Sequence, residues 1–315
     1  MMNRFILFWL VGVSLSAASD FKVCVVNGSR DSLRVAAARV ELLCFAASAQ
    51  DPALIAQKDT GSDGCVSFRL TLADSASDCY FSSVYSGIRY YSDKLNFAQP
   101  PHLITLVIFD TTTDRTSLSI PMHHLIVEEA KDRLHLREMR VLQNGGKSTI
   151  VSKHNQPLLR IAMPVGFSDF SPLTRDFDLA IEGDSLAVRG VLPPGNRTLS
   201  FSYTTTVTRK EIPLSLHFPV PTRNLDLFIH SEHWSLTSSL QDLGDFSIRG
   251  KIYRRRHGEE FAAGQTLSVL FKKEGQSDEG FSPYLTMTLA FLLLTGGFLF
   301  SRVNNTAASS RLKRK

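Results

Sequence analysis

Alternation of apolar and polar residues is the dominant pattern along this chain. In "RTLSFSYTTTV" (197–207), Leu199, Phe201 and Tyr203 alternate with small polar residues, and a period of two is typical of a strand with one buried face. Turn-forming segments such as "NGSRD" and "DTGSDG" separate the early runs. In the first third of the chain, the pattern predicts strands at residues 21–26, 38–45, 65–72, 79–86 and 102–109.

The same pattern continues after Asp110. Runs such as "PLLRIAMPVGF", "IPLSLHFPV" and "QTLSVLFKK" have strand length, and hardly any segment between them is long enough for a helix. Parallel strands usually need a long crossover, most often a helix, so we expect antiparallel pairing. The sequence predicts a mostly β fold of tandem antiparallel β-sandwich domains, Ig-like or transthyretin-like. One domain is expected at residues 20–108, and one large or two small domains at residues 109–271.

The C-terminal end has a different composition. Residues 283–301 carry no charge, and residues 302–315 carry five positive charges and no negative one. A helix of this length spans roughly 28 Å, close to the hydrocarbon thickness of a bilayer. A buried core helix would be shorter or would show a polar stripe. We therefore predict one transmembrane helix at residues 283–301, a stalk at 272–282 and a cytoplasmic basic tail at 302–315.

The N-terminal end has the pattern of a signal peptide. A short positive segment precedes an apolar run at residues 5–13, and small residues stand before Asp20. Cleavage at this point removes residues 1–19 and leaves residues 20–281 outside the cytoplasm, as in a single-pass type I protein. An uncleaved N-terminal anchor is the alternative.

These two ends also explain the net charge of +5. Arg4 lies in the predicted signal peptide and five positive charges lie in the tail, so residues 20–281 carry a net charge of −1. The basic balance is thus a feature of membrane topology. It gives no reason to expect nucleic-acid binding.

All four cysteines, namely Cys24, Cys44, Cys65 and Cys79, lie near the start of the predicted ectodomain. An even number confined to one segment of an extracytoplasmic protein predicts two disulfides in one small domain. Three pairings are possible, and the sequence does not choose between them. Reduced, buried thiols are the alternative, and the absence of a Cys-x-x-Cys spacing disfavours zinc.

Residues 20–108 contain a recognisable motif. "VCVVNGSRDSLRVAAARVELLCF", followed by "DTGSDGCVSFRL", resembles the carboxypeptidase-regulatory-like, or transthyretin-like, β-sandwich module. The residues that carry the resemblance are Val40, Leu42, Thr60, Gly64, Val66 and Phe68. The resemblance implies a noncatalytic module that serves as a spacer or as an accessory to binding.

The rest of the chain resembles other proteins only weakly. "LPPGNRTLSFSY", with "MPVGF" ahead of it, looks like segments of bacterial envelope proteins of uncharacterised function. That resemblance favours a bacterial inner membrane, with the bulk of the chain in the periplasm. The endoplasmic reticulum or plasma membrane of a eukaryote is the alternative, because "RLKRK" is similar to a retrieval signal. Asn27-Gly-Ser and Asn196-Arg-Thr are also glycosylation sequons.

Four residues are candidate metal ligands or catalytic groups. His230 and His233 lie three apart in a run that reads as a strand, where they would point to opposite faces and could not easily hold one ion. Asp176 and Asp178 could present two carboxylates on one strand face. A solvated strand edge explains them better, because charge there discourages aggregation. We expect no metal and no other cofactor.

Two further groups invite attention. Arg254, Arg255 and Arg256 could bind an anion, but a hairpin turning at the glycine after them would pair them with Glu259 and Glu260. His123 and His124 are expected to diverge on a strand, as solvated or edge histidines. Nucleophile elbows, phosphate-binding glycine loops and the His-Glu-x-x-His motif are absent.

The sequence therefore predicts a noncatalytic, membrane-anchored extracytoplasmic protein. We expect it to bind another envelope protein or a glycan through its β domains. A hydrolase or metal-dependent enzyme with a site in residues 109–271 is the alternative, and stoichiometric metal in the purified ectodomain would favour it.

Overall fold

The computed structural model describes residues 19–45, 51–70, 78–97, 101, 103–130, 133–153, 156–206, 211–231 and 233–273. The predicted signal peptide (apart from Ser19), the stalk from residue 274, the membrane span and the basic tail lie outside these residues. Within them, none of the helical structure is long and apolar enough to cross a bilayer. Lys272 and Lys273, which we assigned to the stalk, are the last residues of a strand.

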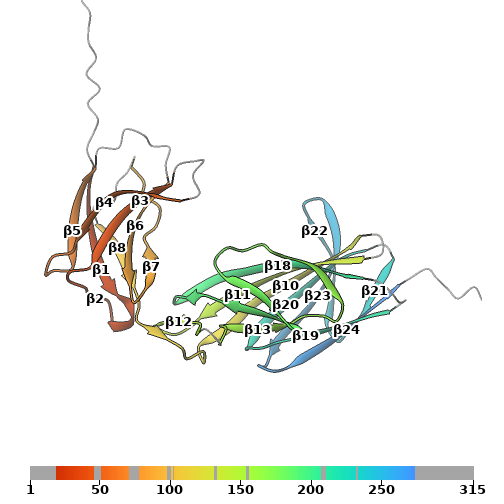
Figure 1. Cartoon of the computed structure of the whole chain (residues 1–315). Helices are drawn as coiled ribbons and strands as arrows, with labels where there is room; N and C mark the ends of the chain where they lie inside the picture. The colour runs from red at the N-terminus through yellow and green to blue at the C-terminus, as the bar shows by residue number, and fades with distance from the viewer. Residues whose placement is uncertain are drawn as a thin grey trace, which may run out of the picture.

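The mostly β prediction is confirmed. Across the described ranges, strands dominate, no α-helix occurs, and the helical structure is the 3-10 turn η1 (Gly28–Arg30). Figure 1 shows the strands gathered into an N-terminal part, residues 19–108, and a larger C-terminal part, residues 111–273. The two parts bury separate hydrophobic clusters.

The N-terminal part contains two four-stranded sheets that share one core. The first sheet contains β1 (Ser19–Asn27), β2 (Leu33–Arg34), β5 (Cys65–Leu70) and β8 (Leu103–Ile108). The second contains β3 (Arg39–Phe45), β4 (Ala53–Asp59), β6 (Asp78–Tyr85) and β7 (Ile88–Tyr91). Phe21 and Phe68 from the first sheet pack against Phe81 from the second. The Phe81 ring centroid lies 6.0 Å from that of Phe21 and 4.9 Å from that of Phe68.

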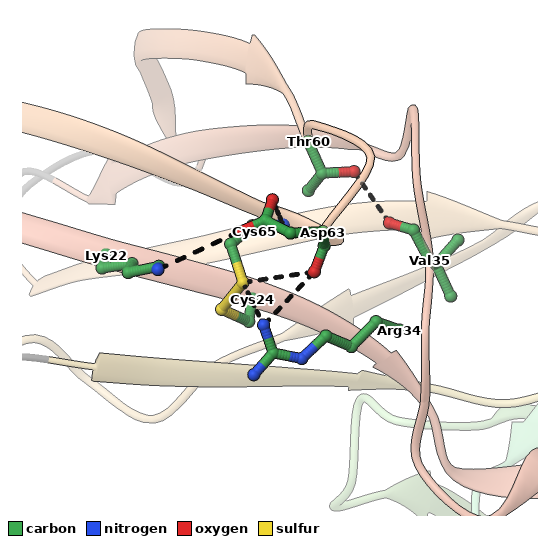
Figure 2. The surroundings of a disulfide bond; sticks show 7 residues. All are labelled: Lys22, Cys24, Arg34, Val35, Thr60, Asp63 and Cys65. Carbon is green, nitrogen blue, oxygen red and sulfur yellow. Dashed lines mark hydrogen bonds and ion pairs between the residues drawn. A yellow bond between two sulfur atoms is a disulfide. The ribbon is translucent and has the colours of Figure 1, made fainter.

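The two disulfides tie neighbouring strands within each sheet. Cys24 on β1 is bonded to Cys65 on β5 (Figure 2), and Cys44 on β3 is bonded to Cys79 on β6. Each pair consists of cross-strand partners in register. This resolves the pairing that the sequence left open, and each sheet receives one bond.

The residues of the transthyretin-like motif occupy structural positions. The Thr60 hydroxyl donates to the Val35 carbonyl at 2.8 Å and accepts from the Ala38 amide at 2.9 Å, so it closes the approach to β3. Gly64 has φ of 71°, and a Cβ there would lie 2.7 Å from the Arg34 Cβ. Only glycine fits this turn without strain. Val40, Leu42 and Phe68 are buried in the core.

The C-terminal part is built on a seven-stranded sheet with the order β14-β18-β11-β10-β20-β23-β22. Its strands are β10 (Leu118–Ala130), β11 (Arg133–Asn144), β14 (Phe167–Pro172), β18 (Gly195–Thr206), β20 (Thr222–His230), β22 (Gln241–Ile248) and β23 (Lys251–Phe261). On β11, Leu134, Leu136 and Leu142 point to the core, and the opposite face is mostly polar, with Met139 and Val141 as its apolar residues.

Three small sheets contribute to the same core as the large sheet. Their strands are β9 (Thr111–Thr112), β12 (Thr149–Val151), β17 (Val191–Leu192), β13 (Leu159–Ala162), β15 (Asp178–Glu182), β16 (Ser185–Arg189), β19 (Glu211–His217), β21 (Trp234–Thr237) and β24 (Thr266–Lys273). The core residues Ile161, Val188, Leu214 and Phe271 come from them.

Pairing is mixed, so the purely antiparallel prediction was wrong. β8 runs parallel to β1, β20 runs parallel to β10, and β12 runs parallel to β9. The connections between β1 and β8 and between β10 and β20 are long, and they contain strands of other sheets in place of a crossover helix.

Asp110 fixes the junction between the two parts. One carboxylate oxygen accepts from the Asn27 amide and the Tyr85 hydroxyl, both at 2.9 Å, and the other accepts from Arg30 Nε at 2.9 Å. Hydrogen bonds from Asn27 and then Arg30 lower the pKa of Asp110 below its usual value. The Tyr90 hydroxyl also lies 2.8 Å from Thr149 Oγ1 across the junction, so the contact is polar and specific.

Candidate functional site

A buried ionic cluster lies on the core face of the large sheet. Glu138 accepts hydrogen bonds from Arg140 Nη2 at 2.6 Å, Arg140 Nε at 2.9 Å and the Tyr203 hydroxyl at 3.0 Å. His123 Nε2 lies 3.0 Å from the same carboxylate. All four side chains are at most 3% exposed. Removing such groups from water is costly unless they satisfy one another, which explains their close packing.

The charge state of the cluster follows from its burial. Arg140 supplies the positive charge that keeps the pKa of Glu138 low despite its burial. Burial and the nearby Arg140 charge lower the pKa of His123 to about 4. His123 is therefore neutral near pH 7, and its Nε2 donates to Glu138. The prediction of a solvated or edge His123 was wrong, because β10 is the central strand of the sheet.

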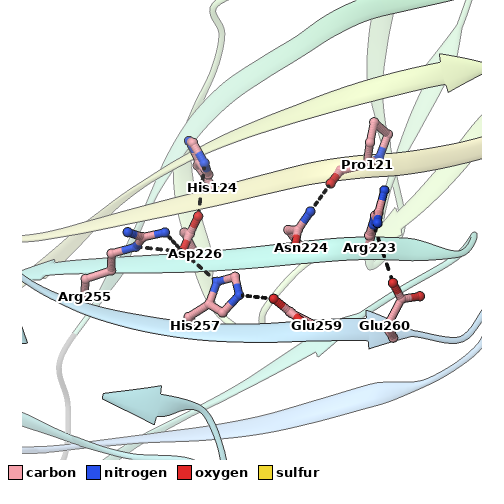
Figure 3. Close-up of polar contacts among 9 residues, drawn as sticks. All are labelled: Pro121, His124, Arg223, Asn224, Asp226, Arg255, His257, Glu259 and Glu260. Atoms are coloured by element: carbon pink, nitrogen blue, oxygen red, sulfur yellow. Dashed lines mark hydrogen bonds and ion pairs between the residues drawn. The ribbon is translucent and has the colours of Figure 1, made fainter. Parts of the chain in front are cut away.

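A second cluster occupies the opposite face of the sheet (Figure 3). Asp226 on β20 accepts from Arg255 at 2.8 Å and from His257 Nδ1 at 2.9 Å, and His124 Nε2 lies 3.4 Å away. His257 Nε2 lies 3.0 Å from Glu259. Register explains the convergence, because His124 and His257 are the cross-strand partners of Asp226 on its two sides.

The pKa values of the two histidines beside Asp226 are shifted in opposite directions. Burial lowers the pKa of His124, whereas hydrogen bonds to Glu259 and Asp226 raise the pKa of His257. Both ring nitrogens of His257 are bonded to carboxylates, so neither is free to bind a metal or to accept a substrate proton. This geometry favours a preorganised surface for recognition over general acid–base chemistry.

Aromatic rings extend this cluster toward the sheet edge. The Arg255 guanidinium carbon lies 5.9 Å from the ring centroids of both Phe228 and Phe246. Those two rings are 5.6 Å apart. Cation–π contacts hold the guanidinium in place, while its other bonds go to Asp226.

The edge itself is the hairpin of β22 and β23, residues 241–261, which we call the edge hairpin. Figure 1 shows β22 extending away from the rest of the sheet. Every residue of β22 from Gln241 to Ser247 is exposed. Leu243, Phe246 and Ile252 are 43, 45 and 62% exposed. In the described part of the chain, β22 pairs with β23 alone, so its other edge is free.

The three consecutive arginines lie on this hairpin, but not as predicted. Arg254 and Arg256 both bind Asp242, at 3.2 and 3.0 Å. The turn is at residues 249–250, and Gly258 lies inside β23, where a Cβ would be 2.6 Å from Leu240. The predicted turn at Gly258 was therefore wrong. The arginines are paired with acidic residues, which reduces their availability for a free anion.

The candidate metal ligands do not converge. His230 ends β20, and its Nδ1 lies 2.8 Å from the Ile252 carbonyl oxygen, whereas His233 lies 3.3 Å from Glu129 after the strand has ended. Asp176 precedes β15 and Asp178 begins it, and both are exposed. Among the residues that the structure describes, no group of three His, Cys, Asp or Glu side chains could hold a metal ion.

A cleft of about 640 Å³ opens between β11 and β19. Its lining is mostly aliphatic and includes Leu136, Met163 and Leu214. Its titratable side chains have other partners: Glu211 pairs with Lys272 at 3.0 Å, and His217 lies 3.4 Å from Thr266. The cleft therefore has room for a ligand, but its titratable side chains already interact with other residues of the protein.

Comparisons with known proteins add little. No family model matches the sequence, and no curated protein matches it. Two structures of native leukotriene A4 hydrolase from Saccharomyces cerevisiae are similar to half of the chain at 12% identity, with TM-scores of 0.35 and 0.34. The similarity covers 29% of those chains. TM-scores this low support no inference about activity.

Proposed function

We propose that this chain is a noncatalytic, membrane-anchored extracytoplasmic protein that binds a partner protein through its edge hairpin. In this proposal, residues 20–108 form a transthyretin-like β-sandwich and residues 109–271 form a second sandwich region. Residues 283–301 anchor both to the membrane. The two disulfides support an oxidising compartment. The exposed edge hairpin is the observation that carries the binding function.

The composition of the edge hairpin supports protein binding. Interface positions that contribute most energy are enriched in aromatic residues and arginine. Phe246 and Arg255 are of these types, and Arg255 is already held by Asp226 and Phe228. A side chain that is ordered before binding loses less entropy on association. The hairpin thus presents apolar and charged contacts in a fixed geometry.

The free edge of β22 favours a polypeptide over a glycan. A strand edge offers unpaired backbone donors and acceptors at the spacing of another strand, as in β-augmentation. Leu243 and Ile252 are aliphatic and exposed, which suits apolar side chains of a protein. We therefore propose an extended segment of a partner protein as the ligand of this edge.

The test uses paired surface variants of the full-length protein. Phe246→Ala with Ile252→Ser removes two of the three large exposed apolar side chains of the edge hairpin and leaves Leu243 in place. Each such truncation at an interface costs about 1–2 kcal/mol, so specific partners should be recovered at least tenfold less efficiently from solubilised membranes. Leu54→Ala with Val84→Ser is the matched control, because these residues are 52 and 51% exposed on the N-terminal part.

Partners that are lost with the hairpin variant and kept with the control support the proposal. Equal recovery with both variants contradicts it. The control variant changes exposed residues, so its unfolding free energy should stay within about 0.5 kcal/mol of the wild type. The hairpin variant also loses the contacts of Phe246 with Phe228 and Arg255, so its unfolding free energy should fall by at most about 2 kcal/mol, and denaturation checks that both proteins stay folded.

A further inference from the structure

The two sequons at Asn27 and Asn196 have opposite surroundings. N-linked glycosylation needs an Asn-x-Ser/Thr sequence and an asparagine amide that can receive a large polar substituent at the surface. Asn27 is 2% exposed, whereas Asn196 is exposed. The structure therefore separates two motifs that are equivalent in sequence.

All of the Asn27 sequon is used by the junction between the two parts. Asn27 Nδ2 donates to Asp110, and Asn27 Oδ1 accepts from the Ser29 amide at 2.9 Å. The Ser29 hydroxyl accepts from the Asp110 amide at 2.8 Å and donates to the Lys147 carbonyl at 2.7 Å. A glycan on Asn27 would replace a hydrogen atom of an amide group that is buried at this contact.

Space at this junction is also limited. A Cβ at Gly28 would lie 2.4 Å from Phe109 Cε1 and 3.0 Å from Val107 Cγ1. Even one additional carbon at the middle of the sequon would therefore require the neighbouring side chains to move. A glycosylated Asn27 is incompatible with the observed contact.

Asn196 lies at the open end of β18. Asn196, Arg197 and Thr198 are all exposed, and the Asn196 and Thr198 side chains form no hydrogen bond with any described residue. Along this edge, β14 pairs with β18 from Phe201 to Thr205, and Thr174 Oγ1 donates to the Thr198 carbonyl at 3.2 Å. Among the described residues, no strand pairs with this edge beside Asn196. A glycan there would displace no contact of the fold.

We propose that Asn196 is an N-glycan acceptor and that Asn27 is not. Asn196 Nδ2 would attack the anomeric carbon of an oligosaccharide linked to a lipid pyrophosphate, a donor that the secretory pathway supplies. The carbon–nitrogen bond forms as the bond from that carbon to the pyrophosphate oxygen breaks. The amide loses one proton, and the lipid pyrophosphate leaves. No electron transfer is involved. The proposal rests on the extracytoplasmic placement of residues 20–281 in a eukaryotic secretory compartment, which is the alternative to the bacterial inner membrane that the sequence favours. It does not rest on the edge hairpin.

The test expresses the full-length chain in a eukaryotic secretory pathway and measures glycan by peptide-N-glycosidase treatment and glycopeptide mass spectrometry. The wild type should lose one glycan on treatment, assigned to Asn196. Asn196→Gln and Thr198→Ala should abolish the modification, whereas Thr198→Ser should retain it. Asn27 should be unmodified in the wild-type peptide, which requires no variant that disturbs the junction.

A wild-type chain without glycan, or one whose glycan remains in Asn196→Gln, overturns the proposal. A third sequon, Asn304-Asn305-Thr306, follows the predicted span and reports topology. Glycan on Asn304 would contradict the proposed membrane orientation. Protease protection of residues 20–281 in the same membranes, with no glycan at Asn196, would contradict only the acceptor assignment.

Discussion

Replacement of Glu138 by Gln isolates the contribution of the buried ionic cluster. The substitution nearly preserves volume but removes the negative charge that Arg140 contacts at 2.6 and 2.9 Å. Arg140 is 2% exposed and would keep its positive charge without a partner. Breaking a buried ion pair in this way costs about 3–5 kcal/mol. For a domain of this size, that corresponds to a fall in Tm of roughly 6–20 °C.

The assay is urea unfolding of a soluble fragment that covers residues 19–273, followed by circular dichroism. Glu138→Gln should lower the unfolding free energy by about 3–5 kcal/mol with an unchanged m-value. The double variant Glu138→Leu/Arg140→Met should recover most of this loss, because apolar residues often replace a buried pair at little cost. Glu182→Gln is the control. Glu182 is 35% exposed and pairs with Arg160, at 2.8 Å, and with Arg189, so the loss of its charge should cost at most about 2 kcal/mol.

Two results would refute this reasoning. One is a Glu138→Gln protein within 1 kcal/mol of the wild type, about the level expected for a surface pair. The other is a double variant that is no more stable than the single one. Either would mean that Arg140 reaches solvent or another partner and that the cluster is not closed.

Three further predictions concern pH, the disulfides and the anchor. The pKa of His123 is lowered to about 4 in the folded state, so as the pH falls the unfolded state takes up this proton before the folded state does. The free energy of unfolding should therefore decrease by on the order of 3 kcal/mol between pH 6.5 and 4. Urea titrations should show a smaller decrease over this pH range for His123→Gln. Cys44→Ala with Cys79→Ala removes a disulfide with a sequence separation of 35 and should lower the free energy of unfolding by about 4 kcal/mol. Mass spectrometry should still find Cys24 bonded to Cys65 in the wild type and in this variant. Any other cysteine pairing in the wild type would contradict the observed strand register. The full-length protein should require detergent for extraction and a chain lacking residues 283–315 should not; release of the intact protein by alkaline carbonate alone would exclude a spanning segment.

Strong alternation allowed most of the early strands to be predicted from sequence. The predicted runs at residues 21–26, 38–45 and 79–86 lie within two residues of the bounds of β1, β3 and β6. β4 was missed because its residues are almost all exposed, so no apolar period marks it. Periodicity detects burial on one face, and a strand without a buried face gives no signal.

The polar clusters were harder to predict because they depend on pairing between distant strands. In "RLHLREMRVLQN", Glu138 and Arg140 fall in step with the apolar positions Leu134, Leu136 and Leu142. The position of these two charged residues on the apolar side of the alternating pattern was the feature of the sequence that could have predicted a buried ion pair. No comparable signal joins His124, Asp226 and His257, whose proximity depends on the order of the strands in the sheet.

Two misassignments have the same physical origin. Gly258 was predicted to form a turn, but it faces Leu240 and Phe261 within β23, where the absence of a side chain permits close packing. His123 was predicted to be solvated, but it lies on the central strand β10. In both cases, local sequence defines the residue type but not the neighbours that surround it.

Site-specific photo-crosslinking from the edge hairpin tests its role in partner binding most directly. A photoreactive amino acid would replace Ile252 in the full-length protein within its own membrane, with Leu54 as the matched exposed position on the N-terminal part. We predict a discrete crosslinked protein from position 252, lost on Phe246→Ala and absent from position 54. No product from position 252, or identical products from both positions, would contradict the assignment of the edge hairpin as the binding surface.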